Sequence, residues 1–279
     1  MKKLTLLLAI FMIANLLYSQ TKDSCLPEGI TFTTQLQIDN FQTNYPGCTE
    51  IEGDVVIGYS WGGTDIINLT GLNVLTFIGG DLTIWNNYVL TSLAGLDNLN
   101  SIGGDLTIEY NPLTSLAGLE GIDSIIGCLN IVNNIFLASL AGLDNLISIG
   151  GCLNINQNGS LTSLTGLECL TCIGSNFLLY DNEVLTSLSG LANLTSVGSS
   201  LKIQGNYGLI SLAGLDNLNS LGGDLTIATN SLTSLAGLEG LDSIVGCLNI
   251  EYNGGLISLT GLEGITSVAG DLNIHSNNS

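Results

Sequence analysis

The chain has 279 residues and a formal net charge of −20, because 24 acidic residues face only 4 lysines and no arginine. Such a surface would repel nucleic acid and anionic lipid, and it lacks the Arg and Lys side chains that phosphoryl transfer normally uses. The hydrophobic content of 45% excludes a disordered chain.

Residues 1–19 have the composition of a secretory signal peptide. Lys2 and Lys3 precede an apolar stretch from Leu4 to Leu17, and Ser19 offers a small residue before a cleavage site. An uncleaved N-terminal anchor is the alternative. No later apolar run approaches the ~20 residues that a membrane-spanning helix needs. We therefore expect a secreted or cell-surface protein with no membrane-spanning segment after the signal peptide.

Residues 20–52 precede the repeats and are expected to form an N-terminal cap. Leu36, Ile38 and Phe41 could cover the open end of a stacked core, which repeat proteins need. In an exported protein cysteines are expected to form disulfides. A bridge from Cys25 to Cys48 would close a 24-residue loop and stabilise the chain by ~3 kcal/mol.

Residues 53–279 form a repeat array. Ten units begin between Gly53 and Gly270, at steps of 23 to 27 residues, and the last unit stops after ten residues. In the unit that begins at Gly80, Leu82 and Ile84 alternate with polar neighbours as in a half-buried strand. Leucines then follow at every third residue, and the interspersed Gly and Ser oppose a helix. This pattern predicts an all-β parallel solenoid of about nine coils with glycine-rich corners.

Two polar rows repeat with the units. A serine row, from Ser92 to Ser258, is expected to be structural, since the chain has a single histidine to serve as a base. The asparagine row occupies the eighth position of nine units, where a stacked amide can donate to one neighbour and accept from the other. We interpret it as a structural ladder; a ligand-binding row is the alternative. Its members are Asn87, Asn111, Asn134, Asn158, Asn182, Asn206, Asn230, Asn253 and Asn277.

The cap and the repeats together resemble the receptor L-domain family. The resemblance rests on the segment Tyr45-Pro-Gly-Cys-Thr-Glu-Ile-Glu-Gly53 and on the units x-L-x-I…N…L-x-S-L-x-G-L-x-x-L-x-S-I-G, and it covers residues 25–279. That family includes the ligand-binding domains of the EGF and insulin receptors and bacterial surface proteins, especially of the Bacteroidetes. The resemblance implies a right-handed β-helix, similar to leucine-rich repeats, and a role in binding or adhesion without catalysis.

Aromatic residues gather at the sixth to tenth positions of the units, beside the asparagine row. Aromatic faces with amide and carboxylate neighbours suit a sugar ring or a protein partner. We therefore expect an aromatic stripe that binds a glycan or a protein; the alternative is that rare residue types collect at variable positions. The stripe comprises Tyr59, Trp61, Trp85, Tyr88, Tyr110, Phe136, Tyr180, Tyr207 and Tyr252.

A column of acidic residues repeats at the seventeenth or eighteenth position of the units. Weak Ca²⁺ binding at Asp97, Glu120, Asp144 and Glu168 is one interpretation, and a solvated acidic ridge is the other. No other cofactor is expected, and no resident metal site is assigned.

The five cysteines of the repeats allow several pairings. Cys128 and Cys152 occupy the same position in adjacent coils, within disulfide reach. Cys169 and Cys172 could form a further bridge, which would leave Cys247 alone, or contribute to a four-cysteine zinc site.

These patterns favour an exported, non-catalytic binding or adhesion module at the bacterial cell surface. A polysaccharide-degrading β-helix enzyme is the competing class. Such lyases need a strong base, and in the repeats only Lys202 is available. Paired carboxylates for glycoside hydrolysis would have to come from the repeating acids. A passive structural surface protein is the third possibility.

Overall fold

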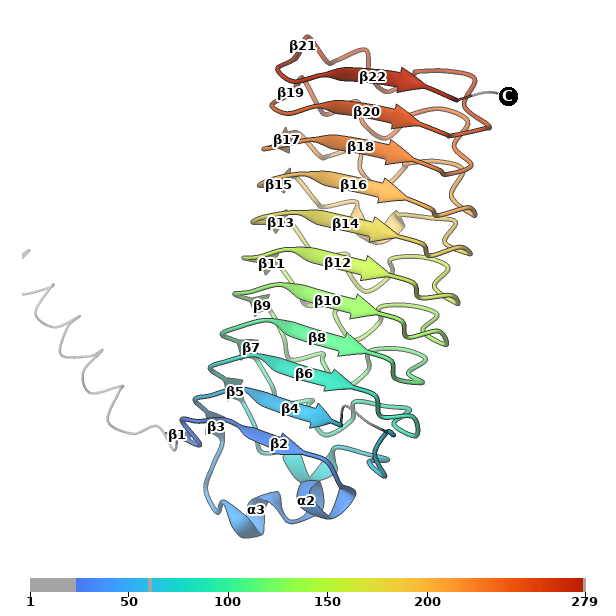
Figure 1. The fold of residues 1–279 in the computed structure, drawn as a ribbon. Helices are drawn as coiled ribbons and strands as arrows, with labels where there is room; N and C mark the ends of the chain where they lie inside the picture. Colours follow the sequence, from blue (N-terminus) through green and yellow to red (C-terminus); the bar gives the residue numbers. More distant parts are fainter. Residues whose placement is uncertain (1–23, 60–61, 278–279) are drawn as a thin grey trace, which may run out of the picture.

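The structure is a computed structural model that describes residues 24–59 and 62–277. It is a parallel β-solenoid, and the fold class predicted from the repeats is confirmed. Figure 1 shows the coils stacked in chain order, with the cap at one end of the stack and the last coil at the other. The predicted signal peptide, residues 1–19, lies outside the described residues.

An eleven-stranded sheet runs along one side of the solenoid. Its strands are β2 (Ile30–Phe32), β4 (Val55–Gly58), β6 (Leu82–Trp85), β8 (Leu106–Glu109), β10 (Leu129–Val132), β12 (Leu153–Asn156), β14 (Phe177–Tyr180), β16 (Leu201–Gln204), β18 (Leu225–Ala228), β20 (Leu248–Glu251) and β22 (Leu272–His275). The cap thus contributes the first strand, and the ten repeat units contribute one strand each.

Two-residue strands form a second sheet where each coil turns back. They are β1 (Ser24–Cys25), β3 (Glu50–Ile51), β5 (Phe77–Ile78), β7 (Ser101–Ile102), β9 (Ser124–Ile125), β11 (Ser148–Ile149), β13 (Cys172–Ile173), β15 (Ser196–Val197) and β17 (Ser220–Leu221). β19 (Ser243–Ile244) and β21 (Ser267–Val268) pair separately.

Register along the long sheet keeps each unit position in one column. Leu82 pairs with Leu106 and Ile84 with Ile108, and all four side chains are fully buried. The third and fifth positions of each unit therefore face the core, and the fourth and sixth face outward. Burial of each such side chain stabilises the folded state by roughly 1.5–3 kcal/mol. Only stacked coils can bury these side chains, so a single coil is not stable without its neighbours.

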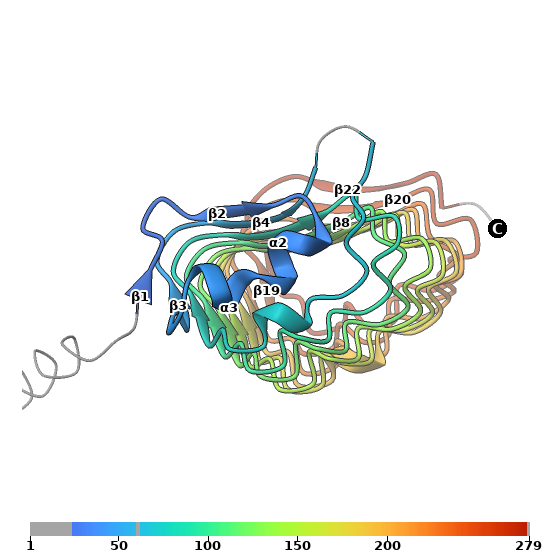
Figure 2. The same cartoon turned by 90° about the horizontal axis from the view of Figure 1, so that it is seen from below.

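The cap closes the first coil with two short helices, α2 (Gln35–Asp39) and α3 (Phe41–Asn44). Thr34 and Gln37 form a capping box at the start of α2. Figure 2 shows both helices lying across the end of the stack. Ile38 and Phe41 are fully buried there, whereas Leu36 is 68% exposed, so its expected part in covering the core is wrong. α2 turns that side chain away from the core.

The Cys25–Cys48 disulfide is present and joins β1 to the segment before β3. Within the described residues no helix is long and apolar enough to span a bilayer.

Candidate binding groove

From β6 onward, each long strand is followed by a residue in the left-handed backbone conformation, at the seventh position of its unit. Its φ is 56° at Asn86, 54° at Tyr110 and 54° at Asn133, and the same conformation recurs in the later coils. The turn ends the strand and directs the next residue, the asparagine of the row, into the coil. Asn and Gly adopt this conformation most readily, and a bulky side chain adopts it at a cost.

The asparagine row is buried at this corner from Asn87 to Asn253, and its side chains are hydrogen-bonded. Asn111 is typical. Its backbone N–H donates to Oδ1 of Asn134 at 3.1 Å, and its Nδ2 donates to the carbonyl of Ile84 at 2.8 Å and of Glu109 at 2.9 Å. Its own Oδ1 accepts from the backbone N–H of Asn87 at 3.2 Å. These amides therefore lock successive corners together and are committed to the fold.

A shortened corner creates a groove in the coil that begins at Gly104. Most coils place two residues between the asparagine and the next leucine, and a turn hydrogen bond closes them, as from Leu90 N–H to the Asn87 carbonyl at 3.0 Å. The Gly104 coil has only Pro112 there. Its corner is recessed between bulkier neighbours, and a groove of about 370 Å³ lies over it, at the small end of ligand-binding pockets.

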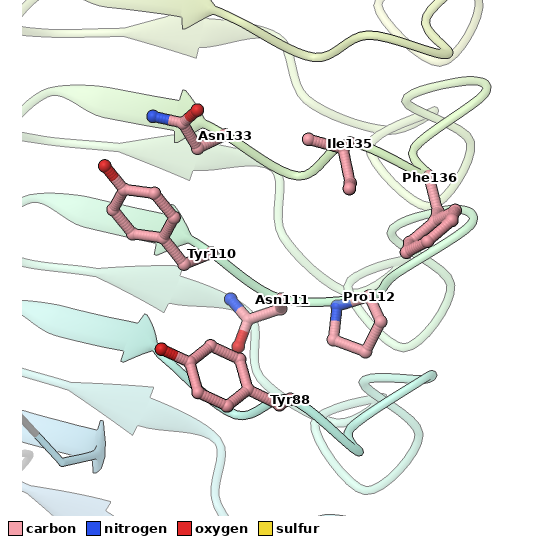
Figure 3. Close-up of a pocket in the computed structure, with 7 residues that line it drawn as sticks. All are labelled: Tyr88, Tyr110, Asn111, Pro112, Asn133, Ile135 and Phe136. Carbon is pink, nitrogen blue, oxygen red and sulfur yellow. The ribbon is translucent and has the colours of Figure 1, made fainter. Parts of the chain in front are cut away.

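The groove is lined by Tyr88, Tyr110, Asn111, Pro112, Asn133, Ile135 and Phe136. Figure 3 shows them on three successive coils, with Tyr88 below, Tyr110 and Pro112 in the middle, and Asn133, Ile135 and Phe136 above. Tyr88, Tyr110, Ile135 and Phe136 are each about half exposed. Apolar surface of this kind, gathered across several coils, is typical of a binding site.

The polar groups of the groove are the two phenols and one amide. Within the described part of the chain, the Tyr88 and Tyr110 hydroxyls form no hydrogen bond, and the Asn133 Nδ2 donates to Gln157 Oε1 at 2.9 Å. The two phenol hydroxyls and the side-chain oxygen Oδ1 of Asn133 are therefore available to a ligand. Beside the groove, burial raises the pKa of the Glu109 carboxyl above its ordinary value.

The structure brings three of the expected aromatic residues together and separates the others. Tyr88, Tyr110 and Phe136 share the groove, whereas Trp85 and Tyr180 lie partly buried on the outer face of the long sheet, on β6 and β14. Three more are exposed at corners away from it: Tyr59, Tyr207 and Tyr252. Trp61 lies outside the described residues. The aromatic set is thus a local cluster with outlying members.

Pro112, Asn133 and Ile135 line the groove but were not predicted from the sequence. The signal that could have found them is the 23-residue step of the Gly104 unit, together with the bulky pair Ile135-Phe136 in the following corner. The second short unit, from Gly223, has Gly254 and Gly255 in the following corner instead.

Carboxylates of the acidic column accept backbone hydrogen bonds. Oδ2 of Asp144 accepts from the N–H of Gly142, two residues earlier, at 2.8 Å, and φ of that glycine is 113°. The same bond recurs at Asp97, Glu120, Glu168, Asp216, Glu239 and Glu263. At Glu263 the bonds with Gly261 and with its own backbone lower the pKa of the carboxyl.

Two coils lack an acid at this position, and both contain a 3₁₀ helix there. These are η1 (Thr70–Leu72), followed by Asn73, and η2 (Ser189–Leu191), followed by Ala192. Coils with a carboxylate at this position therefore form the glycine turn, and coils without one form a 3₁₀ helix. The residues considered for Ca²⁺ are turn acceptors in this structure.

The cysteines of the repeats are split between a disulfide and thiols. Cys128 and Cys152 are bonded across adjacent coils. Cys169, Cys172 and Cys247 are free, so the Cys169–Cys172 bridge is not formed. In the described ranges no three His, Cys, Asp or Glu side chains are grouped so as to hold a metal ion, and a four-cysteine zinc site is not assembled.

Comparison with known proteins adds little beyond the fold. No family model matches the chain, and no curated protein matches it. Among solved structures it is similar to the crystal structure of the TLR13–ssRNA13 complex, a leucine-rich-repeat protein, at 14% identity and a TM-score of 0.20. That match covers 88% of this chain, which spans 50% of the length of the TLR13 chain. The strand topology alone therefore identifies the chain as a repeat solenoid.

Proposed function

We propose that this chain is an exported, non-catalytic binding or adhesion module at the bacterial cell surface, and that its groove around Tyr110 recognises a glycan or a protein. The two disulfides suit an extracytoplasmic compartment. The resemblance of the cap and the repeats to receptor L domains supports the same class of function.

The observation that carries the proposal is the conformation of Tyr110. The fold imposes a left-handed backbone there, and the flanking coils fill the same position with Asn86 and Asn133, which tolerate it. A tyrosine in this conformation costs of order 1–3 kcal/mol, and its hydroxyl forms no bond within the described residues. Tyr252 adopts the same conformation at a corner outside the groove, so the strain alone does not mark a site. At Tyr110 the strained turn coincides with a groove that Tyr88 and Phe136 also line.

A polysaccharide-degrading enzyme is the less supported alternative. Lys202, the one lysine in the described ranges, lies on β16, and its Nζ lies 5.2 Å from the ring centroid of Tyr180, away from the groove. Burial raises the pKa of Glu109, but its register neighbours are Trp85 and Val132, so no second carboxylate pairs with it across adjacent strands.

The test is a comparison of binding by the wild type, two groove variants and one control variant. Purified protein would be applied to an immobilised glycan array and to bacterial and host cell surfaces, with Tyr88→Ala and Tyr110→Asn as groove variants and Tyr207→Ala as the matched control at another corner. We expect both groove variants to lose signal and the control to retain it. Equal signal for all four proteins would contradict the proposal, and release of reducing sugar from a bound polysaccharide would favour the enzyme.

A further inference from the structure

The groove carries no formal charge, although the molecule is strongly acidic. None of its seven lining residues is Asp, Glu, Lys, Arg or His. A polyanion would meet no cation there and would be repelled by a chain of net charge −20. A basic peptide would find no carboxylate in the lining to pair with. The charge of the groove therefore favours an uncharged ligand.

The strand ends beside the groove leave no free sheet edge for an added peptide strand. The N–H groups of Asn86, Tyr110 and Asn133 already donate to the carbonyls of Glu109, Val132 and Asn156 in the next coil, at 3.0–3.2 Å. Those of Asn87 and Asn111 donate to the asparagine row. Strand addition needs a free sheet edge, so an extended peptide cannot join the sheet here, and the side chains of the groove are the main groups left to recognise a ligand.

Those side chains repeat along the solenoid axis with the spacing of the coils. Adjacent strands lie about 4.8 Å apart, which is close to the length of one sugar unit in an extended chain. Tyr88, Tyr110 and Phe136 belong to three successive coils and present ring surface suited to the apolar faces of sugars. The phenol hydroxyls and the Asn133 carbonyl oxygen can bond sugar hydroxyls.

We propose that the groove binds an uncharged polysaccharide, which lies parallel to the solenoid axis with one sugar unit over each of the three coils. This inference rests on the proposed function and names the ligand class of the same groove. Binding of the middle sugar requires the recessed corner at Pro112, because a corner of ordinary length would fill the space that this sugar occupies.

The experiment is a calorimetric titration with oligosaccharides of increasing length. Uncharged probes would be β-1,4-linked oligomers of glucose and of N-acetylglucosamine, and oligogalacturonides of equal length would be the charged comparison. We expect the affinity for an uncharged series to rise up to the length of three units and then level off. Tyr110→Asn should weaken it about tenfold, the loss expected for one aromatic contact.

A one-residue insertion tests the recessed corner directly. Insertion of a serine after Pro112 restores a 24-residue coil and should abolish binding, whereas the same insertion after Ser231, in the second short coil, should leave it unchanged. Circular dichroism would show that both variants fold; if the first does not, Tyr110→Asn still tests the groove.

Two kinds of result would overturn the inference. One is tighter binding of the oligogalacturonides, or affinity that is independent of length. The other is the absence of saccharide binding together with a purified protein ligand that binds wild type and not Tyr110→Asn; the proposed function would then stand without this ligand class. If no Tyr110-dependent ligand of either kind is found, both proposals fail.

Discussion

At the scale of single residues, Tyr110 couples stability to binding. Asparagine at the same position of both flanking coils adopts the left-handed conformation at lower cost. Tyr110→Asn should therefore raise the free energy of unfolding by about 1 kcal/mol while it removes the ring from the groove. Denaturant titration measures the first effect, and Asn86→Ala, which removes a tolerant residue from an equivalent turn, should shift stability in the opposite direction. A destabilised Tyr110→Asn protein would show that the turn is not strained.

The raised pKa of Glu109 predicts a pH dependence of stability opposite in sign to that of an acid whose pKa is lowered by folding, such as Glu263. Burial raises the pKa of its carboxyl in the folded chain. The folded state is therefore penalised once the group ionises, so this contribution to stability is lost as pH rises from the unfolded pKa, near 4.5, through the higher folded pKa. Glu109→Gln should stabilise the protein at pH 7 and make little difference at pH 3. Thermal melts at the two pH values would check this, and equal gains at both would contradict it.

Asp144 tests whether the acidic column shapes the glycine turns. Its carboxylate accepts the Gly142 N–H, whereas the coil with Ala192 forms a 3₁₀ turn instead. Asp144→Ala should cost about 0.5–1.5 kcal/mol, the usual net value of one hydrogen bond, and Asp144→Asn, which keeps an acceptor, should cost less. Addition of EDTA or Ca²⁺ should shift the melting temperature of wild type and variant equally. A larger shift in the melting temperature of the wild type would support Ca²⁺ binding at this column.

At the scale of elements, the asparagine row should dominate the stability of the corners. Asn158→Ala removes the acceptor of the Asn134 N–H and the donor to the carbonyls of Ile131 and Asn156. Because each orphaned buried group costs about 1–3 kcal/mol, we expect a loss of at least about 3 kcal/mol. Asn156→Ala is the matched control, since its buried Oδ1 has no partner among the described residues. Equal losses for the two variants would contradict a structural role for the row.

The same elements show how far the sequence could predict the molecule. Strand positions and the asparagine row follow from periodicity, because each column repeats one environment in every coil. The glycine turns beside the acidic column could not be predicted from the sequence, because they depend on the backbone φ of a glycine two residues before each acid. The groove is not periodic either. It arises where one short corner meets bulky residues from two other coils, Tyr88 below and Ile135 with Phe136 above.

At the scale of the whole molecule, stability should be a sum of coils and of their nearest-neighbour contacts. The core is one continuous column, from Ile38 and Phe41 in the cap to Leu256 near the far end. A destabilising substitution at one end should therefore increase local unfolding of the coils beside it and leave distant coils unchanged. A small globular domain, in contrast, unfolds in an all-or-none transition.

The two disulfides provide the test, because they close segments of nearly equal length at different places. Cys25 and Cys48 are 23 residues apart in the cap, and Cys128 and Cys152 are 24 apart in the middle of the array. Loss of either bond should cost ~3 kcal/mol. In Cys25→Ser/Cys48→Ser, hydrogen exchange should rise in β2 and β4 and stay constant in β16 and β18; in Cys128→Ser/Cys152→Ser the increase should centre on β10 and β12. Uniform loss of protection in both variants would show instead that the solenoid unfolds as one cooperative unit.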